Sequence, residues 1–256
     1  MPYLDINHER IYYASYRGKM PNGVPVVLIH GSGENHLVWP AGLRRLPDTT
    51  VYAIDLPGHG KSSGSGRSTV ADYVEWVQAF LAAIDARQAI LIGHSMGGAI
   101  ALLFGLMYPD RAAGFVLVAS GAKLRVAPKL LELAKNDLPA AAEMVSRLEW
   151  GPNAPAQLIL LGQQQLLTNQ PAVLYDDYSA CDGFDVIDRL GQIAAPTLII
   201  TGTADQMTPI KYATFMADRI PQARLVSIPD VGHMVMLEAE PIVAYEVEQF
   251  VREIKP

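Results

Sequence analysis

The sequence predicts an α/β fold in which helices cover a mostly parallel β-sheet. Short, strongly apolar segments alternate with longer amphipathic ones along the 256 residues, which is typical of strands joined by crossover helices. Half of the residues are hydrophobic, so the chain can bury a sizeable core. Apart from the short loop GKSSGSGRST, no repeat, low-complexity tract or linker composition divides it. We therefore expect a single structural unit.

The strands and helices of this fold can be predicted in chain order. MPYLDI and HERIYYASY are typical of a β-hairpin, and the spacing of apolar residues in 69–86 predicts a crossover helix. PIVAYEVEQFVREI is expected to be a closing helix with Pro241 near its first position. Buried strands are expected at residues 24–30, 50–55, 88–94, 114–120, 196–202 and 223–229.

Residues 121–190 interrupt this alternation and are predicted to form a helical cap. The pieces APKLLELAKN, PAAAEMVSRLEW and PAQLILLGQQQLL have the pattern of short helices, several of them opened by proline. Such a segment has a thin core of its own, so we expect an insertion into a core of residues 1–120 and 191–256. Ligands bind beyond the carboxyl ends of parallel strands, and an insertion leaving from such an end lies over that site as a lid.

Charge and composition restrict the possible partners. The formal net charge is −6 and no run of Lys or Arg is available to neutralise phosphates, which disfavours nucleic acid. The start of the chain lacks the pattern of a signal peptide, and no apolar run approaches the ~20 residues of a membrane helix. A single cysteine, Cys181, excludes an intrachain disulfide. We expect a cytoplasmic protein with no membrane insertion; no oligomeric state is predicted.

Gly93-His94-Ser95-Met96-Gly97 matches the pattern G-x-S-x-G between a predicted strand and a run with helical composition. A serine on such a sharp turn has a strained backbone, and the residues two before and two after it crowd so closely that a Cβ would clash. The hydroxyl is thereby exposed at a helix N-terminus, where backbone N–H groups face any negative charge that forms. Ser95 is therefore the predicted nucleophile.

A serine nucleophile needs a base, and six histidines are candidates. His94 adjoins Ser95, but a tight turn sends neighbouring side chains in different directions, so we interpret it as a packing residue. His233 lies in PDVGHMVMLEAEP, a loop that follows the last predicted strand at the same sheet edge as Ser95, and is the predicted base. The others are His30 and His59, which we expect to shape their loops, and His8 and His36, which have no patterned context.

The acid that orients the base must also come from the carboxyl end of a strand. Asp205, in TLIITGTADQMTP, follows its strand by a few residues within a loop bounded by glycine and proline, and is the predicted acid. The rival Asp55 is expected to hold its own turn in DLPGHGKS. Asp230 is too near His233 in sequence to orient its ring easily.

Acyl transfer further requires donors for the developing oxyanion. Glycines in HGSGE, after the first buried strand, allow backbone N–H groups to face inward, so the amides of Ser32 and Met96 are the predicted oxyanion hole. The GKS fragment of GHGKSS lacks the earlier glycine of a phosphate-binding loop. Neither H-E-x-x-H nor a Cys/His ligand spacing occurs, so no metal is predicted.

These motifs resemble those of the α/β-hydrolase superfamily. HGSGENHLVW, DLPGHGKS, GHSMGGAIAL, PTLIITGTADQMTP and VGHMVMLEAEP occur in the family's order, with Ser95, Asp205 and His233 in its chain order. Within the superfamily, the chain specifically resembles the capped bacterial carboxylesterases and lipase-like hydrolases. The resemblance implies an eight-stranded sheet, a helical cap and a Ser–His–Asp mechanism without cofactor. Two differences disfavour the activities of related families. Dehalogenases and epoxide hydrolases have Asp at the position of Ser95, and plant hydroxynitrile lyases have Lys at the position of Met234.

We therefore expect hydrolysis of small to medium carboxylic esters through an acyl-enzyme on Ser95, with a small-molecule ester as the partner. The cap, rich in Leu and Ala and containing Met144 and Trp150, is expected to supply an apolar pocket. Activity should fall below about pH 6.5 as the base protonates. Two alternatives remain: a carbon–carbon bond hydrolase or acyltransferase with the same triad, and a non-catalytic ligand-binding or sensor protein on the same fold.

Overall fold

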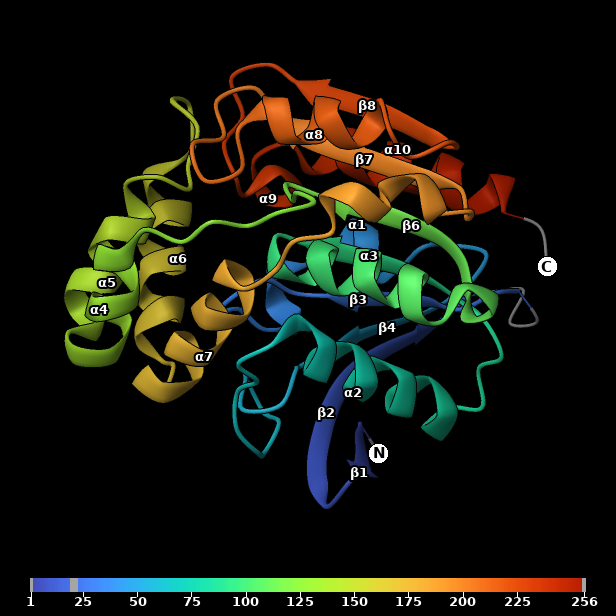
Figure 1. Cartoon of the computed structure of the whole chain (residues 1–256), viewed down its shortest axis with the longest axis horizontal. Coiled ribbons are helices and arrows are strands. Elements are labelled where there is room, and N and C mark those ends of the chain that lie inside the picture. Colours follow the sequence, from blue (N-terminus) through green and yellow to red (C-terminus); the bar gives the residue numbers. More distant parts are fainter. Residues whose placement is uncertain (1, 19–22, 255–256) are drawn as a thin grey trace.

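The computed structural model describes residues 2–18 and 23–254 and shows among them one eight-stranded sheet. Its strand order is β1-β2-β4-β3-β5-β6-β7-β8. The pairs β1/β2 and β2/β4 are antiparallel, and all the others are parallel, so the predicted fold class and hairpin are confirmed (Figure 1). The strands are β1 (Tyr3–Ile6), β2 (Glu9–Arg17), β3 (Val26–Ile29), β4 (Thr50–Ile54), β5 (Ala89–His94), β6 (Ala112–Val118), β7 (Thr197–Gly202) and β8 (Ala223–Ile228).

Two hydrophobic cores lie on the two faces of this sheet. Alternate side chains of β3 serve both cores: Val27 and Ile29 pack into one, Val26 and Leu28 into the other. The first core is covered by α2 (Val70–Ala83), α3 (Met96–Met107) and α8 (Ile210–Ala217). The second is covered by α1 (Ala41–Arg44), α9 (Val235–Glu238) and α10 (Glu240–Glu253). Because both faces are covered, β3, β5 and β7 are buried along their whole length, as their continuous apolar sequence predicts.

Local signals set the ends of the predicted crossover helix. Thr69 caps α2, with its side chain accepting the amide hydrogen of Asp72 at 3.1 Å. The helix ends before Asp85, which has a positive φ of 54° that a helix cannot continue through. The predicted closing helix at the C-terminal end corresponds to α10, which has proline in its first turn.

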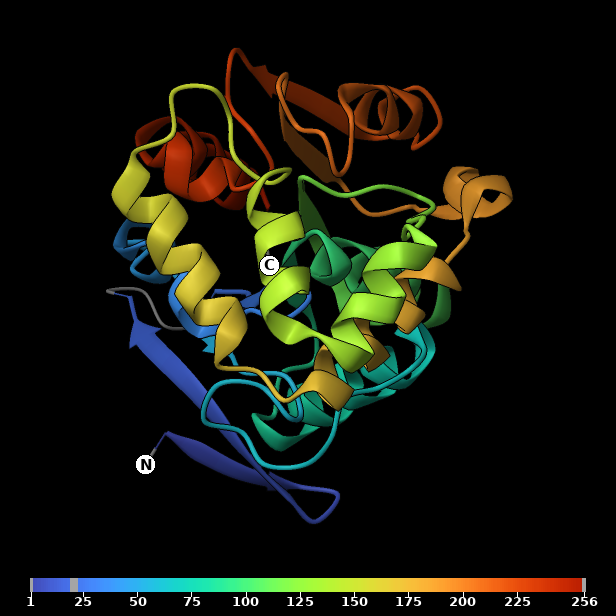
Figure 2. The ribbon, with the colours of Figure 1, turned by 90° about the vertical axis from the view of Figure 1, so that its left-hand side faces the viewer.

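Four helices lie outside the sheet, at one end of it, and are called the four-helix segment below (Figures 1 and 2). Proline stands in the first turn of three of them, α4, α5 and α7, where a missing N–H costs nothing. They share a small apolar core of their own. Its division from the rest of the chain as a cap insertion over residues 121–190, with the role of a lid, stays a prediction. The helices are α4 (Pro128–Asn136), α5 (Leu138–Ser146), α6 (Ala156–Leu167) and α7 (Pro171–Asp182).

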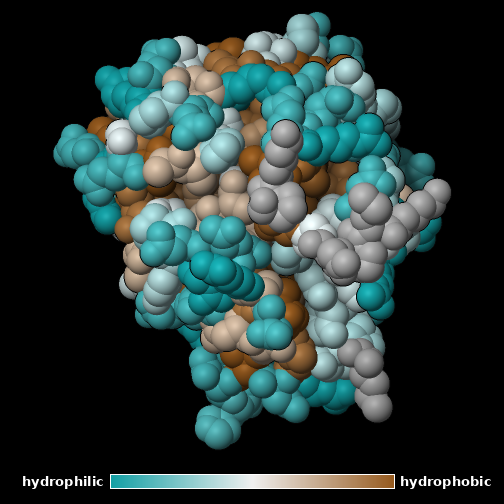
Figure 3. All heavy atoms as spheres, turned by 90° about the vertical axis from the view of Figure 1, so that its right-hand side faces the viewer, coloured by the Kyte–Doolittle hydropathy of each residue, from teal (hydrophilic) through white to brown (hydrophobic). Residues whose placement is uncertain are grey.

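Short 3₁₀ turns complete the chain: η1 (His36–Val38), η2 (Pro109–Arg111) and η3 (Ile187–Gln192). The face turned away from the four-helix segment shows mostly hydrophilic side chains with hydrophobic ones between them (Figure 3). Within residues 2–18 and 23–254, no helix has the length and apolar character needed to cross a bilayer. On the four-helix side, Leu37 and Leu161 are exposed and also line the cavity described next.

Candidate active site

Ser95 lies at the turn between β5 and α3, in a strained backbone conformation. Its φ is 51° and its ψ is −113°, which costs a non-glycine residue on the order of 1–3 kcal/mol. Two hydrogen bonds hold the turn: the Ser95 amide donates to the Val118 carbonyl at 2.9 Å, and Ser120 Oγ donates to the Ser95 carbonyl at 2.8 Å. The turn is therefore anchored to β6 and the residues that follow it.

The two glycines of the motif are required by close backbone approach. A Cβ at Gly93 would lie 2.1 Å from the carbonyl oxygen of Gly97, and one at Gly97 would lie 2.1 Å from the carbonyl oxygen of Ile29. The predicted crowding two residues before and after the serine is thus confirmed. The contact with Ile29 also brings the start of α3 against the end of β3.

His233 and Asp205 form a buried hydrogen-bonded pair. His233 Nδ1 lies 2.8 Å from Asp205 Oδ2, and their side chains are almost entirely buried. Asp205 Oδ1 also accepts the amide hydrogens of Met207 and Thr208, each at 2.8 Å. Thr208 Oγ1 donates to Asp205 Oδ2 at 2.7 Å. Asp205 is thus a well-supported acceptor that holds one nitrogen of the His233 ring.

The charges of this pair favour an ionised acid beside a basic imidazole. Burial alone raises the pKa of Asp205, but the charge and hydrogen bond of His233, with the Thr208 donors, lower it overall. Burial alone lowers the pKa of His233, but the charge and hydrogen bond of Asp205 outweigh it and raise the pKa above its ordinary value. Ser95 and His233 line the same cavity.

His94 is buried beside the predicted nucleophile, as expected of a packing residue, but it also makes hydrogen bonds through both ring nitrogens. Its Nε2 donates to the carbonyl oxygen of His233 at 3.1 Å, and its Nδ1 lies 3.0 Å from Glu34 Oε2. The rings of His94 and His233 are 4.8 Å apart between centroids. Burial alone raises the pKa of Glu34, but the charge and hydrogen bond of His94 lower it overall. Sequence reasoning missed this support for the His233 loop.

Glu149, which follows α5, is the second carboxyl group that sequence reasoning missed. It is 6% exposed, lines the same cavity and accepts a hydrogen bond from Trp150 Nε1 at 2.7 Å. Burial, and then the negative charge of Glu34, raise the pKa of Glu149 to about 7. A buried carboxyl group in a cavity is a signal of function that composition and spacing do not reveal.

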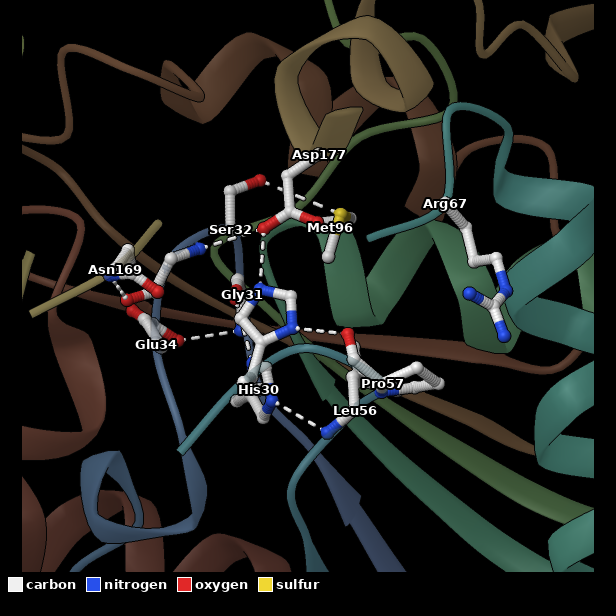
Figure 4. Close-up of polar contacts among 12 residues, drawn as sticks. His30, Gly31, Ser32, Glu34, Leu56, Pro57, Arg67, Met96, Asn169 and Asp177 are labelled. Atoms are coloured by element: carbon white, nitrogen blue, oxygen red, sulfur yellow. Dashed lines mark hydrogen bonds and ion pairs between the residues drawn. The ribbon is translucent and has the colours of Figure 1, made fainter. Parts of the chain in front are cut away.

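The loop after β3 brings Ser32 close to Met96. Ser32 Oγ donates to Met96 Sδ at 3.5 Å, and Ser32 lines the cavity (Figure 4). In the same loop, the amide of Gly31 donates to Glu34 Oε2 at 2.6 Å. The structure therefore places the two predicted oxyanion donors on neighbouring segments, and their role as donors stays a prediction.

The cavity has a volume of about 560 Å³ and lies between the sheet and the four-helix segment. Its floor includes Ser95 and His233 at the carboxyl ends of the strands. All four helices of the segment contribute to its largely apolar walls, among them Leu130, Met144, Leu158, Leu166 and Tyr178. Such a cavity suits a small, mainly apolar ligand.

Asp55, His30, His36 and His59, which were not selected from the sequence, have structural partners. Asp55 accepts the amide hydrogens of His36 and Lys61, at 2.7 and 2.9 Å, so its predicted role in holding its own turn is confirmed. His30 and His59 hydrogen-bond their loops, as expected. In the described part of the chain, no group of three or more His, Cys, Asp or Glu side chains is arranged to hold a metal ion.

Comparison with known proteins places this geometry in a family. A model described as "Alpha/beta hydrolase family" matches residues 26–245. The chain belongs to the α/β-hydrolase family. A solved structure described as that of a thermophilic esterase is 31% identical in sequence, with a TM-score of 0.86 over 98% of this chain and 97% of that one. The family resemblance inferred from the motifs is thus confirmed.

Two relatives among curated proteins carry different names. The pimeloyl-[acyl-carrier protein] methyl ester esterase of Nitrosomonas europaea is 27% identical, over 84% of this chain and 91% of its own. The dihydrolipoyllysine-residue acetyltransferase component of an acetoin cleaving system from Pseudomonas putida is 31% identical over 90% of this chain. This chain spans only 64% of the length of that second relative.

Proposed function

We propose that this α/β hydrolase is a serine esterase that cleaves small to medium carboxylic esters through an acyl-enzyme on Ser95. The observation that carries the proposal is the placement of Ser95, on its strained turn, and of the Asp205-bonded His233 at one apolar cavity. Ester hydrolysis is also supported by the relatives whose names describe esterases.

In the first half of the reaction, Ser95 Oγ attacks the ester carbonyl carbon while His233 Nε2 takes the hydroxyl proton. Asp205 holds the Nδ1–H of His233 and stabilises the imidazolium that forms. The backbone amides of Ser32 and Met96 donate to the oxyanion of the tetrahedral intermediate, where each donor supplies about 2.7–4 kcal/mol. The intermediate then expels the alkoxy oxygen, which leaves as the alcohol with the proton from His233.

In the second half, water replaces the alcohol. His233 Nε2 takes a proton from the water as its oxygen attacks the acyl carbon on Ser95. Collapse of the second tetrahedral intermediate breaks the bond to Ser95 Oγ, which recovers the proton from His233, and releases the carboxylic acid. No step requires a cofactor. The apolar walls of the cavity bind the acyl or alcohol chain and set the size of the substrate.

The test compares the wild type with Ser95→Ala on p-nitrophenyl acyl esters of increasing chain length. Removing the nucleophile should lower kcat at least about 10⁴-fold. A fluorophosphonate probe should label Ser95 in the wild type. Full activity of Ser95→Ala rejects the mechanism. A wild type that is inactive on all esters and gives no Ser95 adduct supports a ligand-binding protein on the same fold instead.

A further inference from the structure

The loop that carries Ser32 is contacted on both sides of Gly33 by side chains of the four-helix segment. Asp177, in α7, accepts the amide hydrogen of Gly33 through Oδ2 at 2.8 Å. Asn169, in the turn between α6 and α7, donates from Nδ2 to the Gly33 carbonyl at 2.6 Å (Figure 4). Gly33 has a φ of 67°, and a Cβ there would lie 2.8 Å from Leu174 Cδ1. The loop and the four-helix segment are thus in direct contact.

Every oxygen of Asp177 is occupied by a donor, although the residue is completely buried. Besides the Gly33 amide, Oδ2 lies 2.8 Å from His59 Nε2, and Oδ1 accepts the Tyr73 hydroxyl at 2.5 Å. The other ring nitrogen of His59 lies 3.0 Å from the carbonyl oxygen of Pro57, so both nitrogens face acceptors. Burial alone lowers the pKa of His59, but the charge and hydrogen bond of Asp177, together with the hydrogen bond to Pro57 and the charge of Asp55, raise it overall. Gly33 is therefore held by one member of a buried ion pair.

The peptide group on the other side of Ser32 is fixed by His30. His30 Nε2 accepts the amide hydrogen of Leu56 at 3.0 Å, which leaves Nδ1–H to donate to the Gly31 carbonyl at 2.8 Å. Burial, and then the positive charge of His59, lower the pKa of His30 to about 4, which keeps the ring neutral as this pattern requires. The Gly31–Ser32 peptide contains the Ser32 N–H, so His30 sets the plane of one peptide and Asp177 that of the next.

We propose that Asp177, together with Asn169, is a positioning residue that aims the Ser32 amide at the oxyanion. The inference rests on the proposed function, because it concerns the donor assigned there. Oxyanion donors accelerate acyl transfer only when they are already aimed at the charge that develops. Contacts from the four-helix segment therefore set the rate of the chemical step, in addition to any effect on substrate binding.

The deciding variant is Asp177→Asn, in which one acceptor oxygen faces three donors. We expect kcat on a p-nitrophenyl ester to fall about 10- to 100-fold with KM changed less than about twofold, a smaller loss than that of a deleted donor. Asp182→Asn is the matched control, because Asp182 ends the same helix and accepts a backbone hydrogen bond, from Val126 at 3.1 Å, away from the Ser32 loop. Its kcat should stay near that of the wild type.

A pair of inhibitors distinguishes a lost orientation of the Ser32 amide from a general loss of structure. An alkyl trifluoromethyl ketone adds Ser95 Oγ to its carbonyl carbon and places the resulting oxyanion at the donors, whereas the corresponding trifluoromethyl alcohol has no such group. In Asp177→Asn the inhibition constant of the ketone should rise at least about 10-fold, as for a weakened oxyanion contact. That of the alcohol should change less than twofold. Asn169→Ala should show the same direction with a smaller effect.

Equal changes for ketone and alcohol, or an unchanged ketone constant, overturn the positioning role. If Asp177→Asn does not fold, Asn169→Ala decides by the same ratio, because Asn169 is partly exposed and its replacement leaves the buried ion pair intact. The two proposals fail differently. An active Ser95→Ala rejects the proposed function, whereas an inactive Ser95→Ala with an unchanged inhibitor ratio in Asp177→Asn rejects only the inference about Asp177.

Discussion

The backbone carbonyl of Glu149 accepts the amide hydrogen of His233 at 2.6 Å. A Cβ on Gly232 would lie 2.3 Å from the amide nitrogen of Gly151, so the two loops meet at backbone contact. The four-helix segment thus contacts the loop of the proposed base as well as the loop of Ser32. Glu34 and Glu149 also add their charges to that of Asp205 in raising the pKa of His233.

The first prediction concerns the pH at which activity is lost. His233 must be unprotonated to take the Ser95 proton, so kcat/KM falls as the pH drops through its pKa in the free enzyme. Because that pKa is raised above its ordinary value of 6.5, the midpoint should lie above pH 6.5, higher than the sequence alone predicted. A pH profile of kcat/KM on an ester with a pH-independent leaving group measures this. A midpoint below 6.5 would contradict it.

Glu149→Gln should move that midpoint toward lower pH. The substitution removes a carboxylate that helps to stabilise protonated His233, while the amide oxygen can still accept the Trp150 hydrogen bond. Glu143→Gln is the matched control, since Glu143 lies on α5 with its side chain exposed and paired with Arg147. Its profile should match that of the wild type. If both variants give the wild-type midpoint, the charge of Glu149 does not raise the pKa of His233.

Asp205→Asn should lower kcat about 10⁴-fold with little change in KM, because an amide donor facing Nδ1 favours the wrong ring tautomer of the base. Its remaining oxygen can keep the Met207 and Thr208 contacts, so the fold should persist. The control is Asp230→Asn: Asp230 is exposed, and asparagine tolerates its positive φ of 58°. Steady-state kinetics on both variants suffice. A larger loss in Asp230→Asn would reverse the assignment of the acid.

Gly97→Ala should destabilise the protein by roughly 1–3 kcal/mol or more, as overpacking does in a closed site. The added methyl group would meet the backbone oxygen of Ile29 at 2.1 Å, and a backbone atom cannot rotate away. Gly183→Ala is the comparison, because the nearest atom to a Cβ there is 3.5 Å away. Urea denaturation of the two variants measures the difference in unfolding free energy. Equal stabilities would show that the turn relaxes freely.

Cys181 should not react with iodoacetamide in the folded protein. Burial raises the pKa of its thiol to about 12, and thiolate is the reactive form. Mass spectrometry should find the native chain unmodified and the denatured chain alkylated once. Because Cys181 also lines the cavity, alkylation of the native chain at a rate near that of the denatured one would mean that the reagent reaches a reactive thiol through the cavity or that α7 opens.

The fold was predictable where burial is continuous, and less so where polar residues are buried. Residues 88–94 were expected to form a strand and correspond to β5, because a strand buried on both faces has an unbroken apolar sequence. Helix α7 lies within the predicted helical segment 121–190 but could not be identified individually from the sequence. Its buried Asp177 interrupts the apolar pattern that identifies a helix, and its hydrogen-bond partners lie more than 100 residues away.

The candidate site, too, was predictable from the sequence only in part. The need for glycine at positions 93 and 97 could be predicted from local geometry, because the atoms that a Cβ would meet belong to the turn itself or to the neighbouring strand. His94 was placed correctly beside Ser95, but its bond to Glu34 joins residues 60 positions apart. Glu149 has no local pattern at all. Its pKa depends on burial within the four-helix segment, whose packing no spacing rule describes.

The contact of Gly97 with the end of β3 has a consequence for how this enzyme family diversifies. The proposed nucleophile Ser95 and the loop of Ser32 are joined through two adjacent parallel strands, whereas the walls of the cavity come largely from the four-helix segment. Substitutions at Leu130, Met144 or Leu158 can therefore alter which chain is bound while the reacting groups keep their spacing. Asp177 and Asn169 are the proposed exception, since an exchange of the whole segment that does not retain them should lower turnover as well as change specificity.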